Sequence, residues 1–290
     1  MTSLAQEAAV PSEIEVAINY LVNTGVTPVF KHAAPGADIA SDAVRGTREP
    51  KVMTVRNARL LPHAFSLDVE GFTLVRHDTK VKDFNDDAEL AAVYTPELEA
   101  LVAGAAGGIE AVVFDHTRRS TDPAHRARHL SRDPVPAPHT DYTAGSAEQR
   151  LRDRFGDAEA KRRLQRRFAI VNVWRSMNKP LEQWPLAVCD GRTIDPARMQ
   201  GTQREAPERA EPSFEYNRPS QTMHAFYDAG HRWYWYPRMA RNEALLFKNW
   251  DTLTDGTARF ALHTAFMEPH TPAHPAHRET IESRLFVFYD

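Results

Sequence analysis

The chain has a single cysteine, Cys189, among its 290 residues. One cysteine excludes an intramolecular disulfide and a zinc cluster built from several thiolates, and it is typical of a protein from a reducing compartment. The sequence also lacks an excess of either charge, since 36 Lys and Arg residues nearly balance 39 Asp and Glu residues. A net charge of −3 gives no field that would favour nucleic acid or an anionic membrane as a partner.

Long apolar runs and secretion signals are missing as well. No stretch approaches the roughly 18 apolar residues needed to span a bilayer, and the first residues lack a basic segment followed by an apolar core. We therefore expect a cytoplasmic protein with no membrane partner. The Gly-x-Ser-x-Gly elbow of hydrolases and the phosphate loop of kinases are also absent, which excludes those classes.

What the sequence does contain is a His-x-Asp motif, His139-Thr140-Asp141, that follows the proline-rich run 134–138. The prolines forbid a helix and favour an extended chain, on which two residues spaced by one lie on the same face. Together with one distant histidine, such a pair forms the facial triad that binds non-heme iron and leaves coordination positions open. The alternative is that His139 and Asp141 are two polar residues at the end of a strand.

His263 is the preferred third ligand because it lies far along the chain and shortly before Arg278 and Arg284. His231 is its rival, although its place after Gly230 at the start of a strand favours a role in a turn or behind the ligands. A buried core residue is the alternative for His263. The order of His-x-Asp, distant His and then Arg is the order found in an iron/2-oxoglutarate oxygenase.

Arginines are needed to bind the far carboxylate of 2-oxoglutarate, ideally through a bidentate guanidinium. The candidates are Arg278 and Arg284, with Arg175 as a third. Arg284 shares its strand with Phe286 and Phe288, so we expect it to point inward if they do. The alternative for Arg278 and Arg284 is an ordinary surface arginine.

The remaining pattern predicts a β-rich protein. Short alternating runs predict strands at 51–56 and 71–76, residues 86–105 predict helices, and six β-rich segments from 169 onward predict a sandwich or barrel. Residues 1–50 are expected to form an N-terminal extension or arm, with a helix near Ser12 to Leu21. Residues 51–290 are expected to form one domain, with a lid-like insertion at about 198–220.

Two segments suggest other classes of protein. Gly104 to Gly108 resembles a nucleotide-binding loop and would suit an S-adenosylmethionine-dependent methyltransferase, but it follows a helix and is more simply a helix stop. The arginine-rich segment 148–168 could bind nucleic acid, yet its interspersed acidic residues favour a solvated helix.

Taken together, several motifs resemble the CmcJ/AsaB/NvfI-like family of oxidoreductases, which includes gibberellin desaturase-like proteins. The resemblance extends from about residue 70 to the C-terminus. The motifs that carry it are Phe114-Asp-His-Thr-x-Arg119, His139–Thr143, Asn172–Arg175, Pro185–Asp190, Trp233–Pro237, Leu246–Lys248 with Asp251, His263–Phe266 and Arg278–Arg284.

The resemblance implies a mainly β fold with flanking helices and a double-stranded β-helix (jelly-roll, cupin-like) core. It also implies that His139, Asp141 and His263 bind Fe(II), with 2-oxoglutarate and O₂ as cosubstrates. The activity implied is that of a dioxygenase of specialised metabolism, which hydroxylates, desaturates or cyclises a small-molecule substrate after hydrogen abstraction.

Aromatic side chains are the candidates for the substrate pocket. They are Tyr142, Trp174, Trp233, Trp235 and Phe266. The substrate, the type of product and the oligomeric state are left open, with a homodimer as one option. The alternatives to an oxygenase are the methyltransferase and a non-catalytic jelly roll that binds a small ligand.

Overall fold

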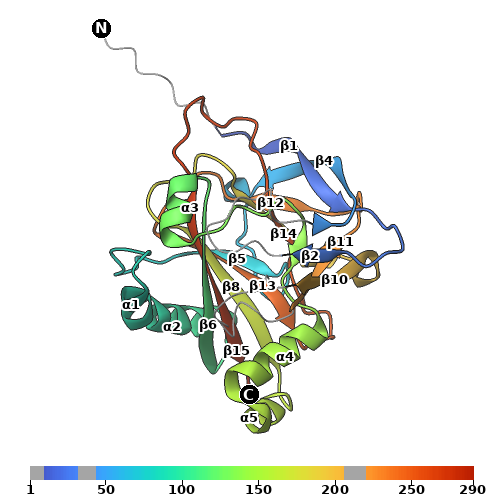
Figure 1. Ribbon diagram of the computed structural model, residues 1–290, viewed down its shortest axis with the longest axis vertical. Coiled ribbons are helices and arrows are strands. Elements are labelled where there is room, and N and C mark those ends of the chain that lie inside the picture. The colour runs from blue at the N-terminus through green and yellow to red at the C-terminus, as the bar shows by residue number, and fades with distance from the viewer. Residues whose placement is uncertain (1–9, 32–43, 206–219) are drawn as a thin grey trace.

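The fold consists of two curled β-sheets that pack against each other (Figure 1). The computed structural model describes residues 10–31, 44–205 and 220–290. The larger sheet has ten strands. In spatial order they are β1 (Glu13–Leu21), β4 (Arg48–Asn57), β12 (Trp233–Trp235), β9 (Leu186–Cys189), β14 (His263–Ala265), β7 (His139–Thr140), β11 (Ser220–Ala225), β10 (Met199–Glu205), β2 (Val29–Lys31) and β3 (Val44–Arg45).

The smaller sheet has five strands and is antiparallel throughout. In spatial order they are β5 (Phe72–Arg76), β13 (Glu243–Asp251), β8 (Phe168–Ser176), β15 (Glu279–Phe288) and β6 (Glu110–Ser120). Two curled sheets packed face to face are the architecture of a jelly roll. The chain is therefore mainly β, as the sequence pattern predicts.

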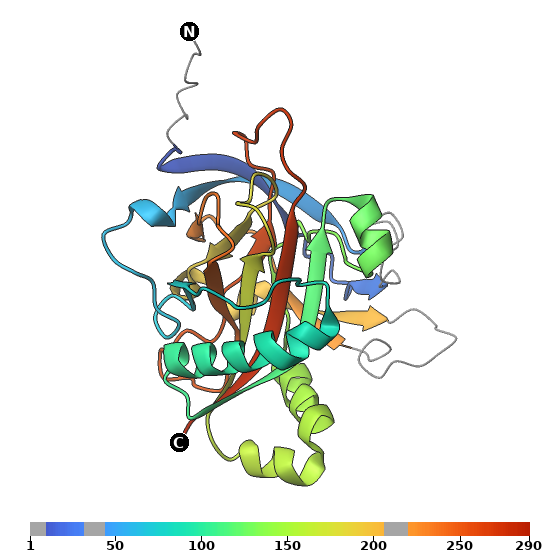
Figure 2. The same cartoon turned by 90° about the vertical axis from the view of Figure 1, so that its left-hand side faces the viewer.

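The helices flank the sheets. They are α1 (Asp87–Glu89), which continues through a π-helical turn (Leu90–Tyr94) into α2 (Thr95–Ala106), then α3 (Pro123–His129), α4 (Ala144–Phe155) and α5 (Asp157–Arg163), with 3₁₀ turns at Ala58–Leu60, Gly191–Thr193 and Pro196–Arg198. Figure 2 shows α2 lying across the outer face of the five-stranded sheet, over β6 and β15. No helix among the described residues is long and apolar enough to cross a membrane.

The glycines at the end of α2 stop the helix and do not form a nucleotide loop. Gly107 adopts the left-handed conformation, with φ of 65°, and its N–H bonds to the Ala103 carbonyl. A Cβ at Gly108 would lie 2.4 Å from Val287 Cγ1, so a side chain there would push the helix end away from β15. This supports the simpler interpretation of the Gly104 to Gly108 run.

The predicted helix near Ser12 to Leu21 is wrong, because this stretch forms strand β1. It pairs along its whole length with β4, from Glu13 opposite Arg56 to Leu21 opposite Arg48. The apolar residues recur at every second position, which fits a strand, and the Ser12 and Glu15 helix-start signal is weaker than that period. The buried residues on one face are Ile14, Val16, Ile18 and Tyr20.

Alternation along β8 decides which of its side chains reach the space between the sheets. Val171 and Val173 pack on the outer face with residues of α2. Asn172 and Trp174 point to the other face, where Trp174 packs with residues of the ten-stranded sheet. The inner face of the five-stranded sheet thus presents polar and aromatic side chains to the opposite sheet.

The lid-like insertion expected at about 198–220 lies partly outside the described residues, because 206–219 are not among them. On either side, β10 and β11 pair antiparallel from Met199 opposite Ala225 to Arg204 opposite Ser220. β11 also pairs with β7, the strand that carries His139. The described part of the segment is therefore a β-hairpin beside the His-x-Asp motif.

A buried ion pair fixes the irregular end of β13. Lys248 and Asp251 are both 0% exposed, and Lys248 Nζ lies 2.7 Å from Asp251 Oδ2. Lys248 also donates to Asp68 Oδ1 at 2.5 Å and to the Ala258 carbonyl at 3.2 Å. Arg167 adds a second cation, at 2.8 Å from Asp251 Oδ2. A buried ion pair whose hydrogen bonds are all satisfied is compatible with a stable fold, whereas the loss of one partner lowers the free energy of unfolding strongly.

We expect Lys248→Met to lower the free energy of unfolding by about 3 kcal/mol, because it leaves Asp251 buried with only one of its two cations. Urea denaturation measures this loss. Lys51→Met is the matched control: it removes the partly exposed pair with Glu49 and should cost less than about 1 kcal/mol. Equal losses in the two variants would contradict the role assigned to the buried pair.

Candidate metal centre

Three side chains from two neighbouring strands converge at one point between the sheets. His139 on β7 lies directly opposite His263 on β14, and Asp141 follows β7. Asp141 Oδ1 lies 3.5 Å from His139 Nε2 and 3.8 Å from His263 Nε2. One ligand atom from each residue lies within 4.8 Å of the others, and a search of the described residues finds no second such group. The structure therefore brings together the three residues predicted from the sequence.

The two oxygens of the Asp141 carboxylate have different surroundings. Oδ2 accepts hydrogen bonds from Arg284 Nε at 2.8 Å and from Asn172 Nδ2 at 3.1 Å. Oδ1 faces the two histidines. Burial would raise the pKa of Asp141, but the charge of Arg284 and the neighbouring histidines hold it well below its usual range. Asp141 is therefore ionised, with one oxygen left for a metal.

Both histidines turn Nε2 towards Asp141 Oδ1. His139 Nδ1 donates to the Ala137 carbonyl at 2.7 Å, because a carbonyl only accepts, and this bond orients the ring. Burial and the nearby His139 hold the pKa of His263 well below its usual range, so this imidazole is neutral. The Phe247 ring packs 4.6 Å from that of His263. Two imidazoles and one carboxylate are a donor set that fits a divalent transition metal.

Arg284 points inward as expected, but its guanidinium is fully occupied by protein carboxylates. Besides Asp141, it pairs with Asp115 at 2.5 Å and with Glu282. Burial alone would lower the pKa of Arg284, and these carboxylates instead raise it well above its usual range. The structure therefore places Arg284 as the partner of Asp141, which leaves it unsuited to hold a cosubstrate carboxylate.

Arg278 differs from Arg284 in forming no ion pair with a carboxylate of the described residues. It is 2% exposed, donates to the Trp184 carbonyl at 2.6 Å and to Thr280 Oγ1 at 3.2 Å, and lies over the Trp174 ring. Among the described residues no carboxylate lies within ion-pair distance of it. Burial, with the nearby Arg119, lowers the pKa of Arg278 to about 9. A buried cation without an anion is costly, so this position favours an anionic ligand.

Arg175 lies on the wrong face of its strand for a role at this centre. Its guanidinium donates to His77 Nδ1 at 2.7 Å and lies over the Tyr94 ring, on the side covered by α2. Residues 172 and 175 are three apart, and on a strand an odd separation puts two side chains on opposite faces.

Comparison with known proteins places the chain in a family. A family model described as "Oxidoreductase/YMDC permease-like domain" matches residues 18–288. The hydroxylase/desaturase efuI of Hormonema carpetanum is 32% identical over 287 residues, which cover 93% of this chain and 95% of that protein. The Fe(II)/2-oxoglutarate-dependent dioxygenase nvfI of Aspergillus novofumigatus is 29% identical over 82% of this chain and 84% of its own length.

The chain belongs to the CmcJ/AsaB/NvfI-like family of non-heme iron oxygenases. The solved structure of the iron and alpha-ketoglutarate-dependent endoperoxidase NvfI superposes with a TM-score of 0.79 at 24% identity, over 96% of this chain and 98% of that one. That likeness confirms the predicted jelly-roll fold. In this fold, the His139, Asp141 and His263 cluster lies where β7 and β14 face the five-stranded sheet.

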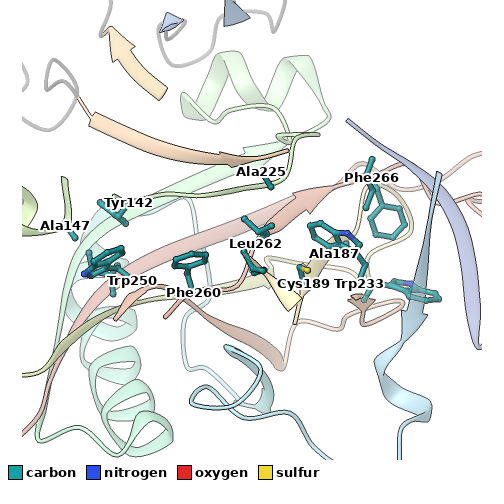
Figure 3. Packing of buried hydrophobic residues seen from close by; sticks show 14 of the residues in the cluster. Tyr142, Ala147, Ala187, Cys189, Ala225, Trp233, Trp250, Phe260, Leu262 and Phe266 are labelled. Atoms are coloured by element: carbon teal, nitrogen blue, oxygen red, sulfur yellow. The ribbon is translucent and has the colours of Figure 1, made fainter. Parts of the chain in front are cut away.

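Of the five aromatic pocket candidates, most belong to the packed core. Figure 3 shows Tyr142, Trp233 and Phe266 among the buried hydrophobic side chains. Trp235 is part of the same cluster and is 0% exposed. Tyr142 follows Asp141 in the chain, but its ring packs against Phe114. Trp174 contacts another candidate site residue through its ring, because Arg278 lies over it.

His231, the rival third ligand, lies away from this cluster in a network of its own. Trp233 Nε1 donates to Tyr20 Oη at 2.8 Å, and Tyr20 Oη lies 3.0 Å from His231 Nδ1. Because the indole only donates, the tyrosine hydroxyl donates to the imidazole. Burial lowers the pKa of His231 to about 4. His231 is thus a neutral acceptor behind β1.

Two asparagines at the centre are absent from the candidates drawn from the sequence. Asn172 binds Asp141 Oδ2, and Asn249 accepts the Asp141 backbone N–H at 2.9 Å. The inward direction of Asn172 could have been predicted from the sequence, since alternation places it on the same face as Trp174. That of Asn249 could not, because Asn249 lies at a break in strand pairing, where alternation fails.

We expect His231 to make the protein less stable in acid. Its pKa is about 4 in the folded protein against 6.5 when unperturbed, so between these values the unfolded chain binds more protons and unfolding becomes easier as the pH falls. His231→Gln removes up to about 3 kcal/mol of that dependence. We therefore expect the free energy of unfolding, measured by urea denaturation, to fall more steeply in the wild type than in the variant between neutral pH and about pH 4.5. A stability difference that does not change with pH would contradict this.

Proposed function

We propose that this protein is an Fe(II)/2-oxoglutarate-dependent oxygenase that acts on a small specialised metabolite, with His139, Asp141 and His263 as the iron ligands. The observation that carries the proposal is the convergence of two imidazole nitrogens and one carboxylate oxygen within 4.8 Å, in a chain whose relatives are named hydroxylases/desaturases and dioxygenases. Hydroxylation, desaturation and oxidative cyclisation all begin with removal of hydrogen from the substrate, and all three suit this site.

The donor set fits iron in its chemistry. Bound iron(II), with 2-oxoglutarate and O₂, supplies the oxidising power for hydrogen abstraction, and 2-oxoglutarate leaves as succinate and carbon dioxide. The chain itself keeps Asp141 ionised through Arg284 and keeps His263 neutral through burial. Three protein ligands leave coordination positions open for the cosubstrate and oxygen.

We propose that Arg278 binds the far carboxylate of 2-oxoglutarate. Among the three candidate arginines, Arg284 is neutralised by carboxylates and Arg175 lies on the outer face of the sheet. Arg278 is buried on the inner side beside Trp174 and has only neutral acceptors. An anion there would form charge-assisted hydrogen bonds in a dry environment, where such bonds are strong.

We also propose that the enzyme works in the cytoplasm without a nucleic-acid partner. The single cysteine is free and buried. Arginines of the basic helical segment pair with acidic neighbours, as Arg162 and Arg163 do with Glu159, instead of forming an uncompensated positive surface. Its partner is then a small-molecule substrate.

Anaerobic titration of the purified protein with Fe(II) and 2-oxoglutarate tests the proposed function. We expect the weak visible charge-transfer band of the chelated cosubstrate in the wild type. Asp141→Ala should lose both the band and turnover while remaining folded by circular dichroism, because Arg284 keeps Asp115 and Glu282 as partners.

His231→Gln is the matched control for that experiment, since the rival histidine lies elsewhere and its variant should keep the band. A folded wild type without the band would instead favour the non-catalytic jelly roll that binds a small ligand. Wild-type turnover in Asp141→Ala would rule out the triad.

Arg278→Gln should weaken the binding of 2-oxoglutarate by about 10- to 100-fold, because hydrogen bonds to a charged group contribute about 1.5–3 kcal/mol each. The dissociation constant is measured from the same band, with Fe(II) saturating. Arg175→Gln is the control and should bind 2-oxoglutarate within about threefold of the wild type. Equal effects of the two substitutions would overturn the assignment of Arg278.

A further inference from the structure

The segment that carries two of the three ligands has little strand pairing of its own. β7 is only His139–Thr140. It forms one residue pair with β14 and two with β11. Asp141 comes after the last paired residue, where the chain turns towards α4. Strand pairing alone therefore does not fix the backbone of Asp141, although its side chain must face two histidines.

A β-bulge in the opposite sheet supplies the missing support. The pairing of β13 with β8 shifts between Lys248 and Trp250, so Asn249 is an extra residue without a partner on β8. Bulges of this kind redirect a side chain, and they occur often beside active sites. The ion pair of Lys248 with Asp251 holds the backbone on both sides of Asn249.

Asn249 is 0% exposed and binds the stretch between the two ligands at several points. Its Oδ1 accepts the Asp141 N–H at 2.9 Å and lies 3.1 Å from the Thr140 hydroxyl. Its backbone carbonyl accepts the same Thr140 hydroxyl at 2.7 Å. These contacts hold the backbone of Asp141, whereas Arg284 and Asn172 hold its carboxylate.

We propose that Asn249 is a positioning residue for the metal centre: it fixes the Asp141 backbone so that the carboxylate presents one oxygen to His139 and His263. The inference rests on the proposed function, since it assigns Asn249 to metal binding. It also gives the buried Lys248 and Asp251 pair a role at the site, because that pair maintains the bulge. A purely structural Asn249 would affect folding stability without a specific effect on the affinity for metal.

Cobalt(II) titration of the metal-free protein separates these roles, with affinity measured by calorimetry and the visible absorption of Co(II) as a second signal. We expect Asn249→Ala to weaken Co(II) binding about 10- to 100-fold, the usual range for residues that orient a ligand. Asn249→Asp keeps the acceptor oxygen and should bind Co(II) no more than about twofold more weakly than the wild type.

Leu98→Ala is the control for a general loss of stability. Leu98 is a fully buried residue of α2, which packs on the outer face of the five-stranded sheet, away from the metal centre. This variant should therefore have a lower melting temperature yet keep its Co(II) affinity. If Asn249→Ala does not fold, Thr140→Val decides, since it removes only the hydroxyl held by Asn249 and should weaken Co(II) binding about 3- to 10-fold.

Wild-type Co(II) affinity in folded Asn249→Ala, or in Thr140→Val where the alanine variant does not fold, would overturn the proposal. A loss of affinity in Leu98→Ala as large as that in Asn249→Ala would overturn it too. Failure of the wild type itself to bind Co(II) would refute the proposed function and with it the basis for this role. The two failures are therefore distinguishable.

Discussion

The ion pair between Arg284 and Asp141 is the interaction on which the metal centre depends. Three carboxylates converge on this guanidinium, and without it their mutual repulsion would force at least one of them to take up a proton. Arg284 also occupies one oxygen of Asp141 and so determines which oxygen faces the histidines. One arginine therefore sets both the charge and the orientation of the only anionic ligand in the triad.

Arg284 is neutralised in this way, whereas Arg278 forms no ion pair with a carboxylate of the described residues. The site thus has the carboxylate and imidazoles of the triad in one place and a buried guanidinium in another, beside Trp174. A dicarboxylate matches this division, since one end suits a metal and the other a guanidinium. The second buried ion network, around Lys248, lies on the same five-stranded sheet and controls the shape of the backbone instead of the charge of the site.

The placement of His139 and Asp141 side by side could be predicted from the sequence because it depends on local rules. Prolines before His139 force an extended chain, and the spacing of His139 and Asp141 places both on one face. The roles of the arginines could not be predicted fully. Alternation along its strand predicts that Arg284 points inward, but only the structure shows that Asp115 on β6 and Asp141 after β7 lie beside its guanidinium. Alternation from Asn172 does predict that Arg175 points to the outer face of β8, away from the triad. The strand at residues 13–21 also obeys a local rule, a period of two, which the helix-start signal at Ser12 obscured.

His139 and His263 belong to the ten-stranded sheet and Asp141 directly follows β7, whereas the residues that hold Asp141 in place lie on the five-stranded sheet. Asn172, Asn249, Arg284 and the Phe247 ring each reach across the interface between the sheets. The binding free energy of the metal is consequently coupled to the docking of one sheet on the other, because only the docked arrangement completes the site. A bound metal therefore favours the docked arrangement of the two sheets, although no residue of the five-stranded sheet belongs to the cluster of His139, Asp141 and His263.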